Sequence, residues 1–305
     1  MKLIRTEDAV GHVLCHDMTQ IIKDKYKDAR FRKGHVVTEE DIPVLLSMGK
    51  EHLYVWEMTP GMVHENDAAE RLLALCGQEN MIRSGVKEGK IELKAACDGV
   101  FLVDSARLVA VNSQDEVMIA TRKGGMAVRE GDKLAGMRVI PLIIEEEKLR
   151  KAEQAAGDKP LLSLKPYVRK TACIVATGGE VKKGLIKDTF TPVVIDKLKT
   201  YGIETLEVVY SGDGVENVRD AVLTMREKKP DMILCTGGMS VDPDDNTPGG
   251  IKAAGANIIA YGAPVLPGAM FLLGYFDDGM PVMGLPGCVM YAGATVFDLM
   301  LPKIA

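Results

Sequence analysis

The sequence predicts an α/β protein. We expect its C-terminal part to form a doubly wound, mostly parallel sheet, preceded by a mixed α/β segment and a small all-β domain. From Thr171 onward, continuous apolar runs alternate with amphipathic helix patterns, an order typical of strands that helices cover on both faces. Residues 86–144 instead hold short apolar or alternating runs between turn residues, which indicates an all-β unit. The length of 305 residues also favours more than one domain.

Four segments follow from these patterns. The sequence predicts a mixed α/β segment over 1–85, a small β barrel or sandwich over 86–144, a linker helix over 145–170 and the doubly wound domain over 171–305. In the first segment, TEEDIPVLLSMG and residues 65–76 have helix patterns, and HLYVWEM has a strand pattern. In the second, IELKAA, GVFLVD, LVAVN, EVMIATR and RVIPLII each predict a strand. In the third, EEEKLRKAEQAA predicts a charged helix that GDKP ends.

The last segment follows a strand-helix-strand-helix-strand order. ACIVAT, ETLEVVY and DMILCT predict parallel strands, and we expect the first helix between them to run from Thr191 as N-cap to Gly202. NIIAYG, AMFLLGYF and PVMGLP predict three further strands, and residues 288–304 predict a closing helix. Ligands of such sheets bind beyond the carboxyl ends of the strands, so we expect the functional site at that edge.

Composition and charge exclude several classes of protein. With 47% hydrophobic and 27% charged residues, the chain has an ordinary globular balance. No run approaches the roughly 20 apolar residues of a membrane span, and the first residues lack a secretory signal pattern, so we expect a cytoplasmic protein. Residues 171–305 hold 11 basic and 16 acidic residues, whereas residues 1–170 hold 27 of each. This distribution offers no basic face for nucleic acid, and a bound phosphate would need amides, helix N-termini or a divalent cation.

The cysteines and histidines predict no metal site. The six cysteines lie far apart without a C-x-x-C pair, which favours reduced thiols over a disulfide framework. All five histidines fall within the first 64 residues, and His12, Cys15 and His16 could together hold a soft metal. On a strand these three side chains point to both faces, which argues against such a site.

Three loops follow the predicted strands at their carboxyl ends. They cover residues 177–191, 236–250 and 284–291. In a doubly wound sheet, loops at these positions can converge on one crevice.

The second loop has the most informative composition. Gly237 and Gly238 allow a sharp turn with exposed amides, and Ser240 adds a hydroxyl. Three carboxylates follow, at Asp242, Asp244 and Asp245. Amides beside carboxylates suit a phosphate bridged by Mg²⁺, a cation that prefers oxygen ligands. A solvated turn that caps a helix near Thr247 accounts for the same composition.

The first and third loops each leave two interpretations open. The polar residues of the first are Glu180, Lys182, Lys183, Asp188 and Thr189, and they suit either a binding loop or a surface turn followed by a helix cap. In the third, Gly284, Pro286 and Gly287 predict an elbow between a strand and a helix. Amides at that elbow could hold an anion, and a purely structural elbow fits equally well.

Taken together, the three loops resemble one family. TGGMSVDPDDNTP resembles the signature G-G-[TV]-[GS]-x-x-x-x-D-x-T-P of the molybdopterin-binding domain. Molybdopterin adenylyltransferases, molybdopterin molybdotransferases, gephyrin and the competence-damage proteins share this domain. The first loop resembles the family's T-G-[DN]-E-[LIV] with a following Gly and D-[ST]. The third, with Pro267-Gly268 upstream, resembles its P-G-K-P and G-[LF]-P-G-N-P, so all three motifs occur in the family's order.

The resemblance implies roles by position. The residues placed on the pterin-binding motifs are Gly178, Glu180, Asp188, Thr189, Gly237, Gly238, Ser240, Thr247, Gly284, Pro286 and Gly287. Asp245 stands where the family has an acidic residue linked to metal-assisted chemistry. The resemblance therefore implies that Asp242 and Asp245 hold Mg²⁺ and serve catalysis.

Four departures from the motifs weaken the case for activity more than the case for binding. Cys288 stands where the third motif usually has Asn, and Val289 where it has Pro. Gly249 replaces the Glu of the adenylyltransferase type, and Ala269-Met270 replaces the Lys-Pro of P-G-K-P.

The resemblance leaves two principal functions open. A shortened or divergent molybdotransferase would bind molybdopterin or its adenylate, cleave the phosphoanhydride with Mg²⁺ and insert molybdate. A non-catalytic carrier or maturation factor would bind the same pterin for a client molybdoenzyme. Hydrolysis of nucleotide pyrophosphates, as in the competence-damage relatives, is a third and weaker alternative. Residues 1–144 resemble the molybdotransferase only loosely, through RKGHVVTEEDIPVLLSMG. Because relatives self-associate through this domain, we also expect a homo-oligomer.

Overall fold

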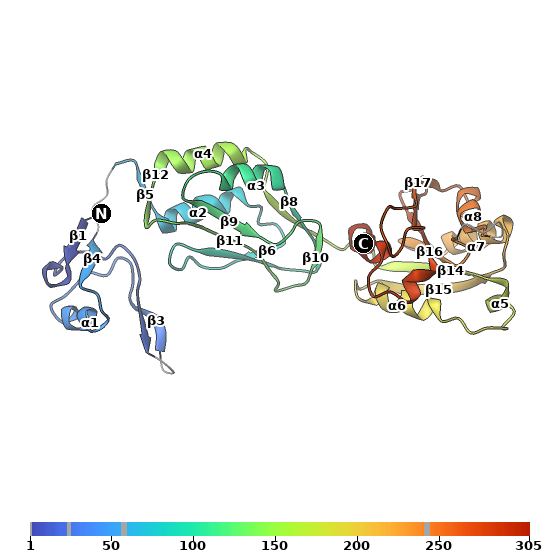
Figure 1. Cartoon of the computed structure of the whole chain (residues 1–305), viewed down its shortest axis with the longest axis horizontal. Coiled ribbons are helices and arrows are strands. Elements are labelled where there is room, and N and C mark those ends of the chain that lie inside the picture. Colours follow the sequence, from blue (N-terminus) through green and yellow to red (C-terminus); the bar gives the residue numbers. More distant parts are fainter. Residues whose placement is uncertain (1, 23–25, 56–59, 241–244) are drawn as a thin grey trace. The chain divides into compact units, whose positions relative to one another are not determined.

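In the computed structural model the chain folds into two compact units (Figure 1). The structure describes residues 2–22, 26–55, 60–240 and 245–305. The first unit comprises Met1–Cys97, Phe101–Gly124 and Glu130–Leu164, and the second comprises Asp98–Val100, Gly125–Arg129 and Lys165–Ala305. Within the described residues, every helix is too short or too polar to span a bilayer.

The first unit begins with two small antiparallel sheets around one apolar core. Its elements there are β1 (Lys2–Arg5), the 3-10 helix η1 (Thr6–Asp8), β2 (Met18–Ile22), β3 (Tyr26–Phe31), α1 (Asp41–Ser47) and β4 (His52–Val55). β1 pairs with β4, and β2 pairs with β3. Leu14, Leu45 and Leu53 are fully buried in the core. The helix predicted in TEEDIPVLLSMG is therefore present as α1, and the strand at the start of HLYVWEM as β4.

A four-stranded antiparallel sheet of order β6-β7-β11-β9 forms the rest of this unit. The elements between residues 62 and 166 are β5 (Met62–His64), α2 (Glu65–Leu75), β6 (Met81–Arg83), β7 (Ile91–Ala95), β8 (Gly99–Val103), α3 (Ser105–Asn112), β9 (Val117–Thr121), β10 (Met126–Val128), β11 (Lys133–Val139), β12 (Ile143–Glu145), α4 (Glu146–Ala156) and β13 (Leu162–Pro166). Ile91, Leu93 and Met137 are fully buried on the face of the sheet that packs against α2. The alternate residues of the same strands lie on the opposite face, which is exposed.

The strand predicted in LVAVN is wrong, because these residues form the second half of helix α3. Asp104 caps the helix by accepting a hydrogen bond from the Arg107 amide at 3.1 Å. At the other end, the Asn112 side chain donates to the Ile119 carbonyl at 2.9 Å and accepts from the Ile119 amide at 2.8 Å. These end contacts stabilise a helix that contains two β-branched valines, so the segment 86–144 is not made of strands alone. The linker helix predicted in EEEKLRKAEQAA is present as α4.

The second unit is built on one six-stranded sheet. Its elements are β14 (Thr171–Thr177), α5 (Gly179–Lys182), α6 (Phe190–Lys199), β15 (Glu204–Ser211), α7 (Val215–Glu227), β16 (Met232–Thr236), α8 (Thr247–Ala253), β17 (Asn257–Tyr261), β18 (Leu272–Tyr275), β19 (Pro281–Leu285), the 3-10 helix η2 (Gly287–Met290) and α9 (Val296–Ile304). The strand order is β15-β14-β16-β19-β18-β17. β15, β14, β16 and β19 run parallel, and β18 and β17 complete the sheet with antiparallel pairs. The predicted doubly wound, mostly parallel sheet is confirmed.

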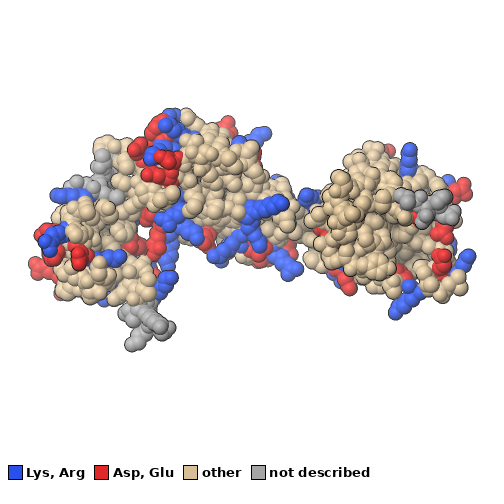
Figure 2. All heavy atoms as spheres, viewed as in Figure 1, with Lys and Arg blue, Asp and Glu red and all other residues tan. Residues whose placement is uncertain are grey.

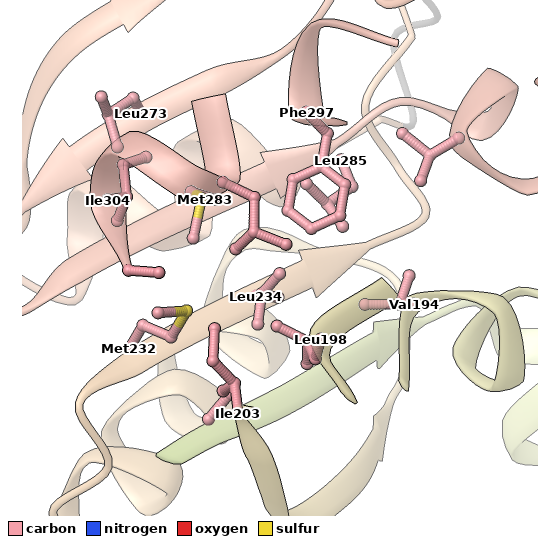
Figure 3. Close-up of a cluster of buried hydrophobic side chains, with 14 of the residues drawn as sticks. Val194, Leu198, Ile203, Met232, Leu234, Leu273, Met283, Leu285, Phe297 and Ile304 are labelled. Atoms are coloured by element: carbon pink, nitrogen blue, oxygen red, sulfur yellow. The ribbon is translucent and has the colours of Figure 1, made fainter. Parts of the chain in front are cut away.

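Apolar cores cover both faces of this sheet. On one face, the core brings together Val194 and Leu198 of α6, Met232 and Leu234 of β16, Met283 and Leu285 of β19, and Phe297 and Ile304 of α9 (Figure 3). On the other face, Val218, Val222 and Met225 of α7 pack with Ile251 of α8. The sheet is therefore the middle of three layers, which explains why its strands are continuous apolar runs.

Two helix boundaries differ from their predictions. α6 begins at Phe190 rather than after Thr191, because the Asp188 carboxylate accepts hydrogen bonds from the Phe190 and Thr191 amides at 2.9 and 3.0 Å. The predicted closing helix is also too long. It starts only at Val296, where Thr295 and Asp298 form a capping box.

Candidate functional site

The loops singled out by sequence meet at one edge of the parallel sheet. Thr177, the last residue of β14, lies opposite Ser211, the last residue of β15. On the other side of β14, Ala176 lies opposite Thr236, which in turn lies opposite Leu285 at the end of β19. Four parallel strands thus end side by side, and the loops that follow them begin at neighbouring positions of the sheet. This is the edge at which doubly wound sheets bind ligands.

The glycine pair of the second loop packs tightly onto the first loop. Gly237 and Gly238 have φ angles of 81° and 58°, in the left-handed region that favours glycine. A Cβ atom on Gly237 would lie 2.2 Å from the Thr177 carbonyl oxygen, and one on Gly238 would lie 2.8 Å from Thr247 Oγ1. A side chain at position 237 would therefore push the ends of β14 and β16 apart, and one at position 238 would displace the start of α8.

Thr247, at the start of α8, binds the backbone at the beginning of the second loop. Its hydroxyl is buried and donates to the Gly237 carbonyl oxygen at 2.8 Å, while its amide donates to the Gly238 carbonyl at 3.2 Å. The same hydroxyl lies 3.4 Å from Thr177 Oγ1 on β14. Thr247, which the sequence placed on the pterin motif, therefore holds the first and second loops together.

The carboxylates of the second loop are only partly within the described chain. Asp242 and Asp244, predicted with Asp245 as metal ligands, lie outside the described residues. Asp245 is half-buried, and no described residue forms a hydrogen bond or ion pair with its carboxylate. The N-cap of α8 is Asn246, so Asp245 does not cap that helix. Burial raises the pKa of Tyr261, and the nearby Asp245 carboxylate raises it further.

Residues of the first loop have partly structural roles. Gly179–Lys182 forms the single turn α5, and Glu180 within it is exposed. Asp188 caps α6 with one oxygen, and its other oxygen accepts from the Tyr210 hydroxyl at 3.2 Å. Burial alone would raise the pKa of Asp188, but hydrogen bonds from Thr191 and Phe190 outweigh it and hold the pKa below its usual value. The helix-cap interpretation of this residue therefore has direct structural support.

The third loop contacts the first through sulfur. Thr189 donates from its hydroxyl to Met290 Sδ at 3.2 Å. Gly284 lies buried inside β19, where a Cβ atom would meet Met239 Sδ at 2.6 Å, so its lack of a side chain makes room for Met239. Pro286 is the N-cap of η2, and a Cβ on the exposed Gly287 would have no neighbour within 4 Å. The elbow is thus tightly packed at Gly284 and uncrowded at Gly287.

A fourth loop, which sequence analysis missed, joins the same edge. It follows β15 and contains Gly212, Asp213 and Gly214. The Asp213 carboxylate accepts from the Gly179 amide at 3.1 Å, and Asn217 donates to the Asp213 carbonyl at 2.6 Å. Its signal in the sequence is the Gly-Asp-Gly triplet between the strand pattern ETLEVVY and the helix pattern that follows.

The departures from the motifs have identifiable structural surroundings. The first turn of α8 packs against the start of α7, and a Cβ on Gly249 would lie 3.1 Å from Val215 Cγ2. Val289 is fully buried in the apolar core, and Cys288 beside it is half-buried. An apolar residue at 289 is therefore explained by packing.

Comparison with protein families agrees with this geometry. A family model described as "Probable molybdopterin binding domain" matches residues 173–305. Residues 173–305 form a domain of the molybdopterin-binding family. The match includes the loops after β14, β16 and β19 but not the N-terminal region. A second model, for a domain of unknown function, matches residues 3–57.

Individual relatives of the molybdopterin-binding domain match only part of the chain. A CinA-like protein of Mycobacterium tuberculosis (strain ATCC 25177 / H37Ra) is 33% identical over 76 residues, which are 25% of this chain and 18% of that protein. The match thus spans less than a fifth of the curated relative. The crystal structure of protein CinA from Thermoplasma acidophilum aligns with 45% of this chain and 99% of its own, at 18% identity and a TM-score of 0.39. The molybdopterin biosynthesis enzyme MoaB from Thermus thermophilus aligns with 44% of this chain and 90% of its own, at 17% identity and a TM-score of 0.38.

Proposed function

We propose that the C-terminal domain binds molybdopterin or its adenylate, and that the protein serves molybdenum-cofactor biosynthesis. The observation that carries this proposal is the meeting of the family's motif loops at one sheet edge, where Thr177, Gly237 and Thr247 are in contact. Since this half of the chain is acidic, the pterin phosphate would be held by backbone amides of the glycine-rich loops rather than by basic side chains.

The donor set at this edge fits Mg²⁺ in its chemistry. Asp245 offers carboxylate oxygens that no described residue engages, and Asp242 lies three positions before it in the chain. Magnesium prefers such oxygen ligands and often bridges a carboxylate to a phosphate. We propose that Asp242 and Asp245 would hold the ion, which would offset the charge of a bound phosphate.

In the catalytic version, one water hydrolyses the phosphoanhydride of adenylylated molybdopterin, which gives molybdopterin phosphate and adenosine monophosphate. Molybdate then binds the two dithiolene sulfurs, and one of its oxygens leaves as water with the two thiol protons. Amides of Gly237 and Gly238 would orient the phosphate, and the hydroxyl of the exposed Ser240 would donate to its oxygens. The packing of Thr247 against both loops would keep this arrangement rigid.

In the alternative version, the same edge binds the pterin without turnover. Ala269, Met270 and Cys288 favour this alternative, because they stand where the catalytic relatives carry polar groups or the Lys-Pro of their motif. The protein would then be a carrier or maturation factor for a molybdoenzyme. For either version we propose a cytoplasmic homo-oligomer that receives molybdopterin and, if catalytic, molybdate.

Identification of the ligand that co-purifies tests this proposal. The full chain is expressed in cells supplied with molybdate and purified without oxygen, and released small molecules are identified by mass spectrometry. We expect a pterin close to one per chain. A matched pair of variants distinguishes pterin bound at the motif loops from pterin adsorbed elsewhere on the protein. Gly237→Ala should lose the pterin, whereas Gly255→Ala, with a similar φ of 91° and no atom within 4 Å of its Cβ position, should keep it. Absence of any pterin from wild-type protein would reject the proposal.

A further inference from the structure

A row of three residues crosses the centre of the exposed face of the β6-β7-β11-β9 sheet, and two of the three are very small. Glu92 of β7, Gly136 of β11 and Ala120 of β9 are direct neighbours across the three strands. One pair further along, Arg138 lies opposite Met118. Because side chains alternate along strands, these residues all lie on the face opposite α2.

A hollow of about 410 Å³ lies over this row. Gly136 has no side chain and Ala120 has only a methyl group, so the centre of the sheet is low and its surroundings stand higher. The basic residues that line the hollow are Lys90, Arg122, Lys133 and Arg138. Glu92 is the one carboxylate among the described residues that line it. Figure 2 shows basic side chains gathered over this part of the first unit.

The ion pairs of Lys90, Lys133 and Arg122 are exposed and exchangeable. Arg138 differs, because it lies 3.8 Å from the largely buried carboxylate of Glu65. Lys90 and Lys133 share Glu92, with Nζ to carboxylate distances of 2.6 and 3.3 Å. Arg122 pairs with Asp132 at 2.7 Å, with both side chains more than a third exposed. Exposed ion pairs contribute little stability, so these cations can turn toward a bound anion at small cost.

The floor and the rim of the hollow favour different parts of one ligand. Gly136, Ala120 and Met118 form an apolar floor that suits a flat ring, and thioethers pack well against rings. The rim offers arginine and lysine donors, which bind phosphate oxygens with charge-assisted hydrogen bonds. A single-stranded nucleic acid fits less well, because such strands bind on exposed aromatic side chains and the described lining has none.

We propose that this hollow binds a small phosphate-bearing ligand with a flat ring, such as a nucleotide or a pterin phosphate. The site lies on the first unit and is independent of the motif loops of the C-terminal domain. The proposal therefore stands or falls separately from the function proposed for that domain.

Calorimetric titrations of the full chain test the ligand chemistry. The probes are ATP, neopterin monophosphate, adenosine, inorganic pyrophosphate and a single-stranded oligonucleotide, all at low salt with a chelator. We expect ATP or neopterin monophosphate to bind about tenfold more tightly than adenosine or pyrophosphate, because each of those lacks one half of the recognised chemistry. Whichever of ATP and neopterin monophosphate binds more tightly shows whether the ligand is a nucleotide or a pterin phosphate. Below, the two probes are called the ringed phosphates, because each joins a flat ring to phosphate. Equal binding of pyrophosphate, preference for the oligonucleotide, or no binding of either ringed phosphate would each overturn the proposal.

Variants place the binding in the hollow. Gly136→Leu fills the floor, and its Cβ would meet only the flexible end of Lys90 at 3.4 Å and the Ile91 carbonyl at 3.8 Å. We expect Gly136→Leu, and the pair Arg122→Gln with Lys133→Gln, to weaken the ringed phosphate about tenfold without a change in thermal midpoint. Arg219→Gln on α7, which removes a basic side chain outside the hollow, should leave its affinity unchanged. If Gly136→Leu binds as wild type does, or if Arg219→Gln weakens binding as much as the paired variant, the hollow is not the site.

Discussion

The Thr247 hydroxyl donates a hydrogen bond to the Gly237 carbonyl oxygen at 2.8 Å, ten residues earlier in the chain. This contact holds the glycine-rich loop against the start of α8 and is shielded from water, since Thr247 is fully buried. We predict that Thr247→Val, which keeps the shape and removes the donor, lowers the free energy of unfolding by about 1–3 kcal/mol. Urea denaturation of the purified variant measures the change.

Thr247→Ser is the matched control for that experiment. It keeps the hydroxyl and removes a methyl group, so its cost should be smaller than that of the valine. A serine variant as unstable as the valine variant would show that packing, and not the hydrogen bond, dominates at this position.

Helices α7 and α8 touch through Gly250. A Cβ on Gly250 would lie 2.4 Å from Val218 Cβ, which real side chains do not tolerate. We predict that Gly250→Ala destabilises the protein by about 1–3 kcal/mol through overpacking, despite the better helix propensity of alanine. Combining it with Val218→Ala should recover part of this loss, as a double-mutant cycle by urea denaturation will measure. Purely additive effects would contradict the contact.

The buried His64 should make the free energy of unfolding of the first unit depend on pH. Burial lowers the pKa of His64, which is 4% exposed, although the hydrogen bond to the Cys15 carbonyl opposes this shift. Nδ1 of the ring accepts from the Asn66 amide at 3.1 Å and faces Lys33 Nζ at 3.0 Å, and neither contact survives a proton on Nδ1. The unfolded chain, with an ordinary pKa of about 6.5, therefore takes up this proton more readily than the folded one. Stability should be full above that pH and fall as the pH drops through it toward the lower folded value.

Urea denaturation at pH 7.5 and at pH 5.5 checks this sign. His64→Asn retains a side chain that can cap α2 but no longer titrates, so its midpoint should depend less on pH than that of wild type. His52→Asn, at an exposed position on β4, should keep the wild-type dependence. Identical pH dependence in wild type and His64→Asn would show that other groups account for it.

Asp245 separates the catalytic version of the proposed function from the carrier. Asp245→Asn keeps the shape and should change stability by less than about 1 kcal/mol. If the domain is an enzyme, Mg²⁺-dependent cleavage of adenylylated molybdopterin should fall by about two orders of magnitude or more. Asp220→Asn, on the exposed side of α7, is the control and should keep full turnover. Wild-type protein that binds the adenylate without turnover would instead support the carrier.

The sheet of the C-terminal domain was predictable because strands that are buried on both faces consist of continuous apolar runs. ACIVAT and DMILCT are apolar except at their ends, and their apolar residues lie in the buried strands β14 and β16. LVAVN was not predictable in the same way, since its propensity favours a strand and only the contacts of Asp104 and Asn112 favour α3.

The candidate site was predictable to the level of its loops. Motif order and strand ends place the three loops at one edge without any coordinates. A helix cap in the first loop was one of the two interpretations that the sequence left open, and Asp188 forms it. The bond from Tyr210 to Asp188 and the packing of Met239 on Gly284 join residues distant in sequence, so neither could be inferred from the motifs. Asp213 was missed because no motif marks it, although the loop that contains it begins beside the first.

Whether molybdopterin binds at this edge of the sheet is measured by its equilibrium binding to the full chain, under anaerobic conditions with Mg²⁺. We expect a saturable one-to-one complex in wild type. We also expect affinity at least about tenfold lower in Gly237→Ala, whose added Cβ would clash with the Thr177 carbonyl, and wild-type affinity in Gly255→Ala. Equal affinity for all three proteins, or no binding by wild type, would contradict the assignment of molybdopterin to this edge of the sheet.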